Sequence, residues 1–139
     1  MGKTRIEGRL ELKRKLNRVA AAPREPLEAE VDWEAKDLVK RMKRIVQRRT
    51  GNLAASIREE PGPTDMSRDV KAGGPLTTKP VRNSKKGNAP HYDYALADEY
   101  GREGQEADPF FWTTVRSRRK TYRRRRATAL NKAVKAAVK

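Results

Sequence analysis

The sequence contains no cysteine among its 139 residues and a single histidine, His91. Without thiols, the chain forms neither a disulfide nor a thiolate zinc site. No stretch approaches the roughly 20 consecutive apolar residues that a membrane-spanning helix needs. The N-terminal residues also lack the apolar centre of a signal peptide. We therefore expect no disulfide framework, no metal, no cofactor and no membrane partner.

Residues that could support catalysis are scarce as well. Asp98 and Glu99 are neighbours in a stretch that we expect to be a strand, where adjacent side chains point to opposite faces. They would then be unable to act as a paired acid and base. His91 follows Pro90 in an expected loop, where an exposed histidine is more common than a catalytic one. No glycine-rich phosphate loop is present either, and the sequence predicts a protein that is not an enzyme.

Positive charge dominates what is present. The chain has 34 lysines and arginines against 18 acidic residues, a formal net charge of +16, and residues 116–139 contain 11 basic and no acidic side chains. Such a field attracts nucleic acid, an anionic membrane or an acidic protein surface, and charge alone does not choose among them. Apolar residues make up 35% of the chain. The core should therefore be thin, and burial against further copies would add to it.

Two helices are predicted for the first third of the chain. The first covers about residues 4–21, and Pro23 and Pro26 end it because proline interrupts the backbone hydrogen-bond ladder. The second covers about residues 27–48 and has the strongest helical periodicity in the chain. Its apolar positions are Leu27, Val31, Ala35, Leu38, Met42 and Ile45. We expect this second helix to face the core.

The middle of the chain is richer in breakers and shorter elements. Gly51 is expected to stop the second helix in a left-handed conformation. Residues 53–60 fit either a strand or a short helix, and a short strand is predicted around residues 68–72. Residues 74–91 have little apolar content and predict a long, flexible, basic loop. Tyr92, Tyr94, Leu96 and Tyr100 then stand at alternate positions, as in a half-buried strand.

The last segment predicts a basic helix. Asp108 and Pro109 are expected to open it, with Asp108 as the cap, and the aromatic residues 110–112 favour a core or interface anchor. The four arginines Arg123, Arg124, Arg125 and Arg126 surround all faces of a helix. Three interpretations stay open for them: a solvated tail, contact with DNA phosphates, or docking on an acidic partner.

Two spaced motifs resemble the tail-completion family of long-tailed double-stranded-DNA bacteriophages. Residues 49–57, Arg-Thr-Gly-Asn-Leu-Ala-Ala-Ser-Ile, are similar to its "Thr-Gly-x-Leu-x-x-Ser-Ile" after a long helix. Residues 94–101, Tyr-Ala-Leu-Ala-Asp-Glu-Tyr-Gly, resemble its "Tyr-Ala-x-x-x-Glu-aromatic-Gly", and residues 107–111 resemble the "Pro-Phe" that opens its last helix. Order and spacing match over most of residues 5–125. The chain departs from the family at residues 23–26 and 74–90 and at Asp98, where the family usually has an apolar residue.

The resemblance implies one α+β domain over residues 1–139. It would contain a long N-terminal helix, a small antiparallel sheet and a C-terminal helix packed on that sheet. The composition of this chain adds a flexible basic loop about 74–91 and a basic helix or tail about 116–139. The implied role is a ring, often a hexamer, that caps the tail tube as a tail terminator and joins it to the neck. Its implied partners are further copies, the tail-tube protein, a neck stopper or connector protein, and genomic DNA in the channel.

The implied location is the head–tail junction of a virion made in the host bacterial cytoplasm. Two alternatives stay open: a head-completion, stopper or neck adaptor ring, and a sequence-independent nucleic-acid-binding protein. The motif residues are expected to be structural, and Glu99 either pairs with an arginine or is an exposed edge charge. These residues are Thr50, Gly51, Leu53, Ser56, Ile57, Tyr94, Glu99, Gly101, Pro109 and Phe110. The candidates for channel or partner contact are Lys79, Arg82, Lys85, Lys86, Arg123, Arg124, Arg125 and Arg126.

Overall fold

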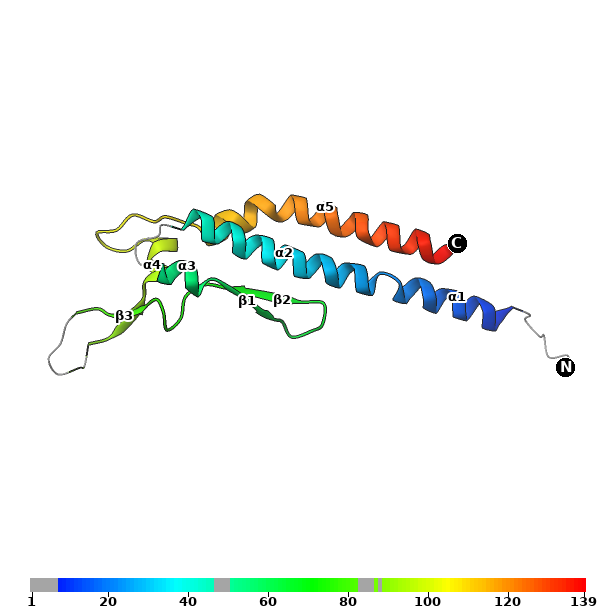
Figure 1. Ribbon diagram of the computed structural model, residues 1–139, viewed down its shortest axis with the longest axis horizontal. Coiled ribbons are helices and arrows are strands. Elements are labelled where there is room, and N and C mark those ends of the chain that lie inside the picture. The colour runs from blue at the N-terminus through cyan, green and yellow to red at the C-terminus, as the bar shows by residue number, and fades with distance from the viewer. Residues whose placement is uncertain (1–7, 47–50, 83–86, 88) are drawn as a thin grey trace, which may run out of the picture.

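The computed structural model describes residues 8–46, 51–82, 87 and 89–139 and has an α+β architecture. The molecule is elongated: two long antiparallel helices give it its length, and the strands lie beside one of them (Figure 1). The predicted class, with a long N-terminal helical region, antiparallel strands and a C-terminal helix, is confirmed. The strands form two separate two-stranded sheets where one small sheet was expected.

Two helices make up the N-terminal third, as the periodicity predicts. Helix α1 (Arg9–Ala21) has no buried residue, and α2 (Arg24–Ile45) begins after a break at Pro23. Pro26 lies inside the first turn of α2, where the amide hydrogen that proline lacks would have no partner in the helix. The predicted ends of these helices, residues 4–7 and 47–48, lie outside the described residues.

Helix α5 (Phe111–Val138) runs antiparallel along α2, and one carboxylate links the two (Figure 1). Asp37 Oδ2 accepts hydrogen bonds from the Tyr122 hydroxyl at 2.7 Å and from Arg41 Nε at 2.8 Å. Arg118 Nε lies 3.3 Å from the same oxygen. Tyr122 is buried. A polar cluster therefore sets the register of the helix pair.

The strands form two hairpins. Strand β1 (Arg58–Pro61) pairs with β2 (Arg68–Lys71), which confirms the strand predicted around residues 68–72. Strand β3 (Thr78–Pro80) pairs with β4 (His91–Asp93). The prediction of a loop throughout residues 74–91 is therefore wrong at its ends. Three-residue strands rich in polar residues carry no periodicity, and their stability comes from cross-strand pairing that the local sequence does not reveal.

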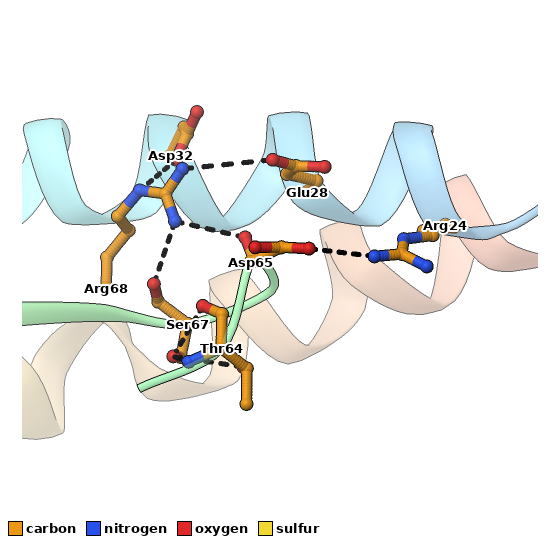
Figure 2. Close-up of polar contacts among 7 residues, drawn as sticks. All are labelled: Arg24, Glu28, Asp32, Thr64, Asp65, Ser67 and Arg68. Atoms are coloured by element: carbon orange, nitrogen blue, oxygen red, sulfur yellow. Dashed lines mark hydrogen bonds and ion pairs between the residues drawn. The ribbon is translucent and has the colours of Figure 1, made fainter. Parts of the chain in front are cut away.

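One arginine fastens the first hairpin to α2 (Figure 2). Arg68 Nε lies 2.5 Å from Asp32 Oδ1, and another guanidinium nitrogen lies 4.0 Å from Glu28. The same guanidinium donates to the carbonyl oxygen of Asp65 at 3.0 Å in the turn of the hairpin. A second ion pair, Arg24 to Asp65 at 2.8 Å, is largely exposed. The hairpin is thus held against α2 by one partly buried arginine and one surface pair.

The apolar core lies where α2 ends and α5 begins. It combines residues from α2, the short helices α3 (Asn52–Ser56) and α4 (Tyr94–Tyr100), and the start of α5. Its buried members are Met42, Val46, Leu53, Ile57, Ala95 and Phe110. The expected core positions at Leu53, Ile57 and Phe110 are confirmed. Phe110 lies at the start of α5, and Val70 and Ala72 of the first hairpin pack against the same cluster.

Residues 94–100 form a helix, so the predicted strand there is wrong. Tyr92, Tyr94 and Leu96 alternate as in a strand, yet Tyr92, Leu96 and Tyr100 are also four apart, which is helical spacing. The side chain of Asp93 favours the helix over the strand for these residues. Its Oδ1 accepts a 2.9 Å hydrogen bond from the Ala95 amide, which caps the helix.

Candidate assembly interface

Glu99 is the residue on which the α4–α5 junction depends. Its carboxylate is buried and accepts three backbone hydrogen bonds: from Phe110 at 2.9 Å and Phe111 at 2.8 Å to Oε2, and from Trp112 at 3.0 Å to Oε1. The first amides of a helix have no partner inside it, and a negative charge suits their partial positive charge. Glu99 therefore caps α5 from a neighbouring helix.

This arrangement corrects two expectations. Glu99 pairs with backbone amides and not with an arginine, and it is not an exposed edge charge. Asp108 does not occupy the cap position, because α5 begins at Phe111 and its N-cap residue is Phe110. Pro109 is exposed just before that cap. The sequence could not show the cap, since Glu99 is 11 residues from Phe110 and reaches it only through the turn between α4 and α5.

The same junction turns three large side chains outward. Leu96 is 61% exposed, Tyr100 65% and Trp112 46%. Trp112 Nε1 donates a 2.9 Å hydrogen bond to the Tyr100 hydroxyl, so the two rings hold each other in place. We call these three residues the aromatic patch. Beside it lies a groove of about 420 Å³ that Ala72 and Phe111 help to line, and Arg58 and Lys71 also border it.

Ser56, in the motif at residues 49–57, links α3 to the chain that follows β2. The Ser56 hydroxyl donates to the Leu53 carbonyl oxygen at 2.7 Å and accepts from the Gly73 amide at 3.0 Å, which ties α3 to the end of β2. Gly51 has the predicted left-handed conformation, with φ at 76°, but it precedes α3 and does not stop α2, which ends at Ile45. Thr50 lies outside the described residues. Gly101 ends α4, also with positive φ.

Asp93 also links separate segments next to α4, and the sequence did not single it out as a site residue. Besides capping α4, its Oδ2 accepts a 2.7 Å hydrogen bond from the Gly74 amide. Burial alone would raise the pKa of Asp93, but hydrogen bonds from Thr77, Gly74 and Ala95 hold that pKa below its ordinary value. The position of an aspartate directly before Tyr-Ala-Leu-Ala is a helix-cap signal that could have revealed it.

A second apolar surface lies at the far end of the molecule. Helix α1 extends beyond the C-terminal end of α5, away from α4 and the aromatic patch (Figure 1). Leu12 and Leu16, one helical turn apart, are each 59% exposed, and Leu10 is 73% exposed. We call Leu12 and Leu16 the α1 leucines. The elongated subunit therefore has exposed apolar side chains near both of its ends.

The basic candidates are not brought together. Lys79 is in β3, with its Nζ 5.1 Å from the centroid of the Tyr94 ring, and Arg82 is exposed just beyond that strand. Lys85 and Lys86 lie outside the described residues. The arginines of residues 123–126 are far from β3, along α5 (Figure 1). The described basic candidates near β3 and those on α5 therefore do not form one site.

Within the described residues, no group of three histidine, cysteine or acidic side chains could hold a metal ion. No helix in the described ranges is long and apolar enough to cross a membrane. No protein-family model, curated protein or solved structure matches the chain. Function is therefore inferred from the fold and its surfaces.

Proposed function

We propose that this protein is a structural subunit of the head–tail junction of a long-tailed DNA bacteriophage, and that it is not an enzyme. It assembles as a ring, with six copies the expected number, which caps the tail tube and joins it to the neck. The observation that supports this proposal is the pair of apolar surfaces near opposite ends of one elongated subunit: the aromatic patch and the α1 leucines.

Two different surfaces favour a ring over a simple dimer. Exposed apolar groups that cluster commonly mark contacts with other proteins. A two-fold dimer needs one self-complementary surface, whereas head-to-tail contact needs two unlike surfaces and repeats into a ring where the rotation between copies closes. The proposed contact places the α1 leucines of one copy against the aromatic patch of the next. Helix α1 contacts α5 but has no buried residue, so packing on a neighbouring copy would also stabilise it.

The place of the ring in a virion comes from the resemblance of the two motifs to the tail-completion family. The motif residues that the structure describes build the frame under the aromatic patch: Ser56 ties α3 to β2, and Glu99 fixes α4 to α5. The proposed partners are therefore further copies of the chain, the tail-tube protein below and a neck protein above.

Native mass spectrometry tests the proposal on the purified protein, alone and mixed with the tail-tube protein encoded beside it. We expect a closed oligomer in at least the mixture, and electron microscopy should place it between capsid and tail. The variant Leu12→Glu/Leu16→Glu should abolish the oligomer and leave the circular dichroism of the folded subunit intact.

A matched control introduces two charges at other exposed apolar positions. Met66 in the turn of the first hairpin and Val138 at the end of α5 are 38% and 51% exposed. The variant Met66→Glu/Val138→Glu should still assemble. A wild-type protein that stays monomeric with its tail-tube protein, or equal assembly by both variants, would contradict the proposal.

A further inference from the structure

The basic helix α5 divides its charges between two faces. Between Phe111 and Val138 it has 10 basic residues and no acidic one. Three of the basic residues turn inward and meet carboxylates of α2: Arg118 with Asp37 at 3.3 Å, Arg125 with Glu30 at 2.9 Å and Arg126 with Glu34 at 3.2 Å. The guanidinium of Arg125 also lies 3.8 Å from the centroid of the Trp33 ring.

The ion pairs with α2 explain the charge of these three arginines, whereas the other basic residues of α5 have no such partner among the described residues. The three arginines neutralise the acidic residues that α2 turns toward α5, including the buried Glu34. All four arginines of residues 123–126 are exposed, but Arg123 and Arg124 form no ion pair in the described part of the chain. The structure thus divides the four consecutive arginines into two that form ion pairs with α2 and two that form none among the described residues.

The outward positions form a regular row. Arg116, Lys120 and Arg124 are four residues apart, so they lie on one face at intervals of about 6 Å along the helix. All three are exposed and without an ion pair among the described residues. Like charges four residues apart destabilise a helix by a few tenths of a kcal/mol per pair. This outer row (Arg116, Lys120, Arg124) therefore costs stability, and no contact in the structure offsets the cost.

We propose that the outer row binds the phosphate backbone of double-stranded DNA without reading its sequence. Phosphate contacts need positive charge along a line and no base-reading geometry. Trp112, 46% exposed, lies one turn before Arg116, and beyond it the described surface of α5 exposes no further large apolar side chain before Leu130. An acidic protein partner would ordinarily need an apolar anchor among the charges. The row has none between Arg116 and Arg124, so it suits a uniform polyanion better. This proposal does not depend on ring formation.

The test is fluorescence anisotropy of the full-length protein with a labelled random-sequence duplex, measured over a series of salt concentrations. In the variant Arg116→Gln/Lys120→Gln/Arg124→Gln, binding at low salt should weaken at least tenfold. The slope of log affinity against log salt should fall by about 2 to 3, since each lost phosphate contact removes about one. Circular dichroism should show α5 still folded.

The chain offers a control of equal charge and equal spacing. Lys36, Lys40 and Arg44 are also four residues apart and exposed, but they lie on α2, which carries acidic residues of its own. Lys36→Gln/Lys40→Gln/Arg44→Gln should keep the salt slope within about one of wild type. Native mass spectrometry of both variants reports assembly separately, so a failure of ring formation is distinguishable from a failure of DNA binding.

Three outcomes would overturn the proposal. The first is absence of DNA binding by the wild type at low salt. The second is an equal loss of slope in both variants, because that indicates attraction by the whole molecule. The third is displacement of the duplex by polyglutamate of equal total charge, because that indicates a face that recognises acidic protein.

Discussion

The hydroxyl of Tyr122 donates a 2.7 Å hydrogen bond to Asp37, which stands 85 residues earlier in the chain. The bond joins α5 to α2 at a point where both side chains are largely shielded from water. Burial and the bond to Asp37 raise the pKa of Tyr122 to about 12. Burial would raise the pKa of Asp37, but hydrogen bonds from Arg41 and Tyr122 hold it below its ordinary value.

Replacing Asp37 should weaken the helix pair in a pH-dependent way. Asp37→Asn loses the charge that Arg41 and Arg118 meet, and we expect a loss of about 2 kcal/mol in the free energy of unfolding at pH 7. An acid with a lowered pKa stabilises the fold above its unfolded value, 3.8, and this contribution is lost as pH falls through the lower folded value. Urea unfolding at pH 7 and near pH 2 measures the difference, which should shrink in acid.

Tyr122→Phe is the control for that experiment. It removes one hydrogen bond and leaves Asp37 with two arginines, so its cost should be about 1 kcal/mol. A loss for Asp37→Asn no larger than the loss for Tyr122→Phe, or a loss that stays the same in acid, would contradict the role assigned to the carboxylate.

Glu34 should behave in the opposite way. Burial raises its pKa, and nearby Glu30 also raises it, while Arg126 lowers it. An acid with a raised pKa stabilises the fold below its unfolded value, 4.5, and that contribution is lost as pH rises through the folded value. Glu34→Gln should therefore be as stable as wild type at pH 7, or more stable by up to about 1 kcal/mol, because a buried ion pair is often no better than a neutral group.

The comparison at acid pH completes that prediction. Below pH 4 the wild-type carboxyl is protonated, and the two proteins should unfold at the same urea concentration. Glu30→Gln, which loses the ion pair between Arg125 and the more exposed of the two carboxylates, serves as control and should cost less than about 1 kcal/mol. A large loss for Glu34→Gln at pH 7 would mean that Arg126 outweighs burial.

Removal of the Glu99 cap should be the most damaging single change at the junction. Glu99→Ala leaves three helix amides without their acceptor, and we expect a loss of about 2 to 4 kcal/mol in the free energy of unfolding. Thermal unfolding by circular dichroism measures it. Glu106→Ala, at an exposed position of the adjoining loop, should change stability by less than about 0.5 kcal/mol. Similar losses for the two variants would rule out the cap.

The two arginines of Figure 2 should differ in importance. Arg68 has 22% of its side chain exposed and meets two carboxylates and backbone oxygens, whereas the Arg24 side chain is 65% exposed and meets Asp65 alone among the described residues. Arg68→Ala should lower stability by about 2 kcal/mol, and Arg24→Ala by less than about 0.5 kcal/mol. Chemical unfolding of both variants at low and high salt checks this. Equal losses would show that burial does not separate the two pairs.

The sequence predicted the long helices well because their apolar residues repeat every three to four positions and prolines mark the break between them. The motifs that resemble the tail-completion family predicted Leu53, Ile57 and Phe110 as core residues, and all three are buried. Prediction from the sequence failed at residues 94–100, where seven residues satisfy both the helical and the strand period. The deciding signal there was the capping carboxylate of Asp93, a single side chain.

The remaining features depend on contacts between distant segments. The cap from Glu99 exists because the chain turns back between α4 and α5. The division of the arginine run depends on the register of α5 against α2, which Asp37 and Tyr122 set. Such features follow from tertiary packing, and local composition does not encode them in a readable way.

The off-centre core should give the subunit a gradient of local stability. The buried apolar cluster lies at one end of the helix pair, whereas α1 has no buried residue and the last turns of α5 are mostly exposed. Backbone amides around Met42 should exchange hydrogen with solvent only through global unfolding. Amides near Val138 should exchange through local opening, which needs little free energy. The end of the subunit that contains the core would thus keep a fixed conformation, while the end that contains α1 could change conformation when it contacts a partner.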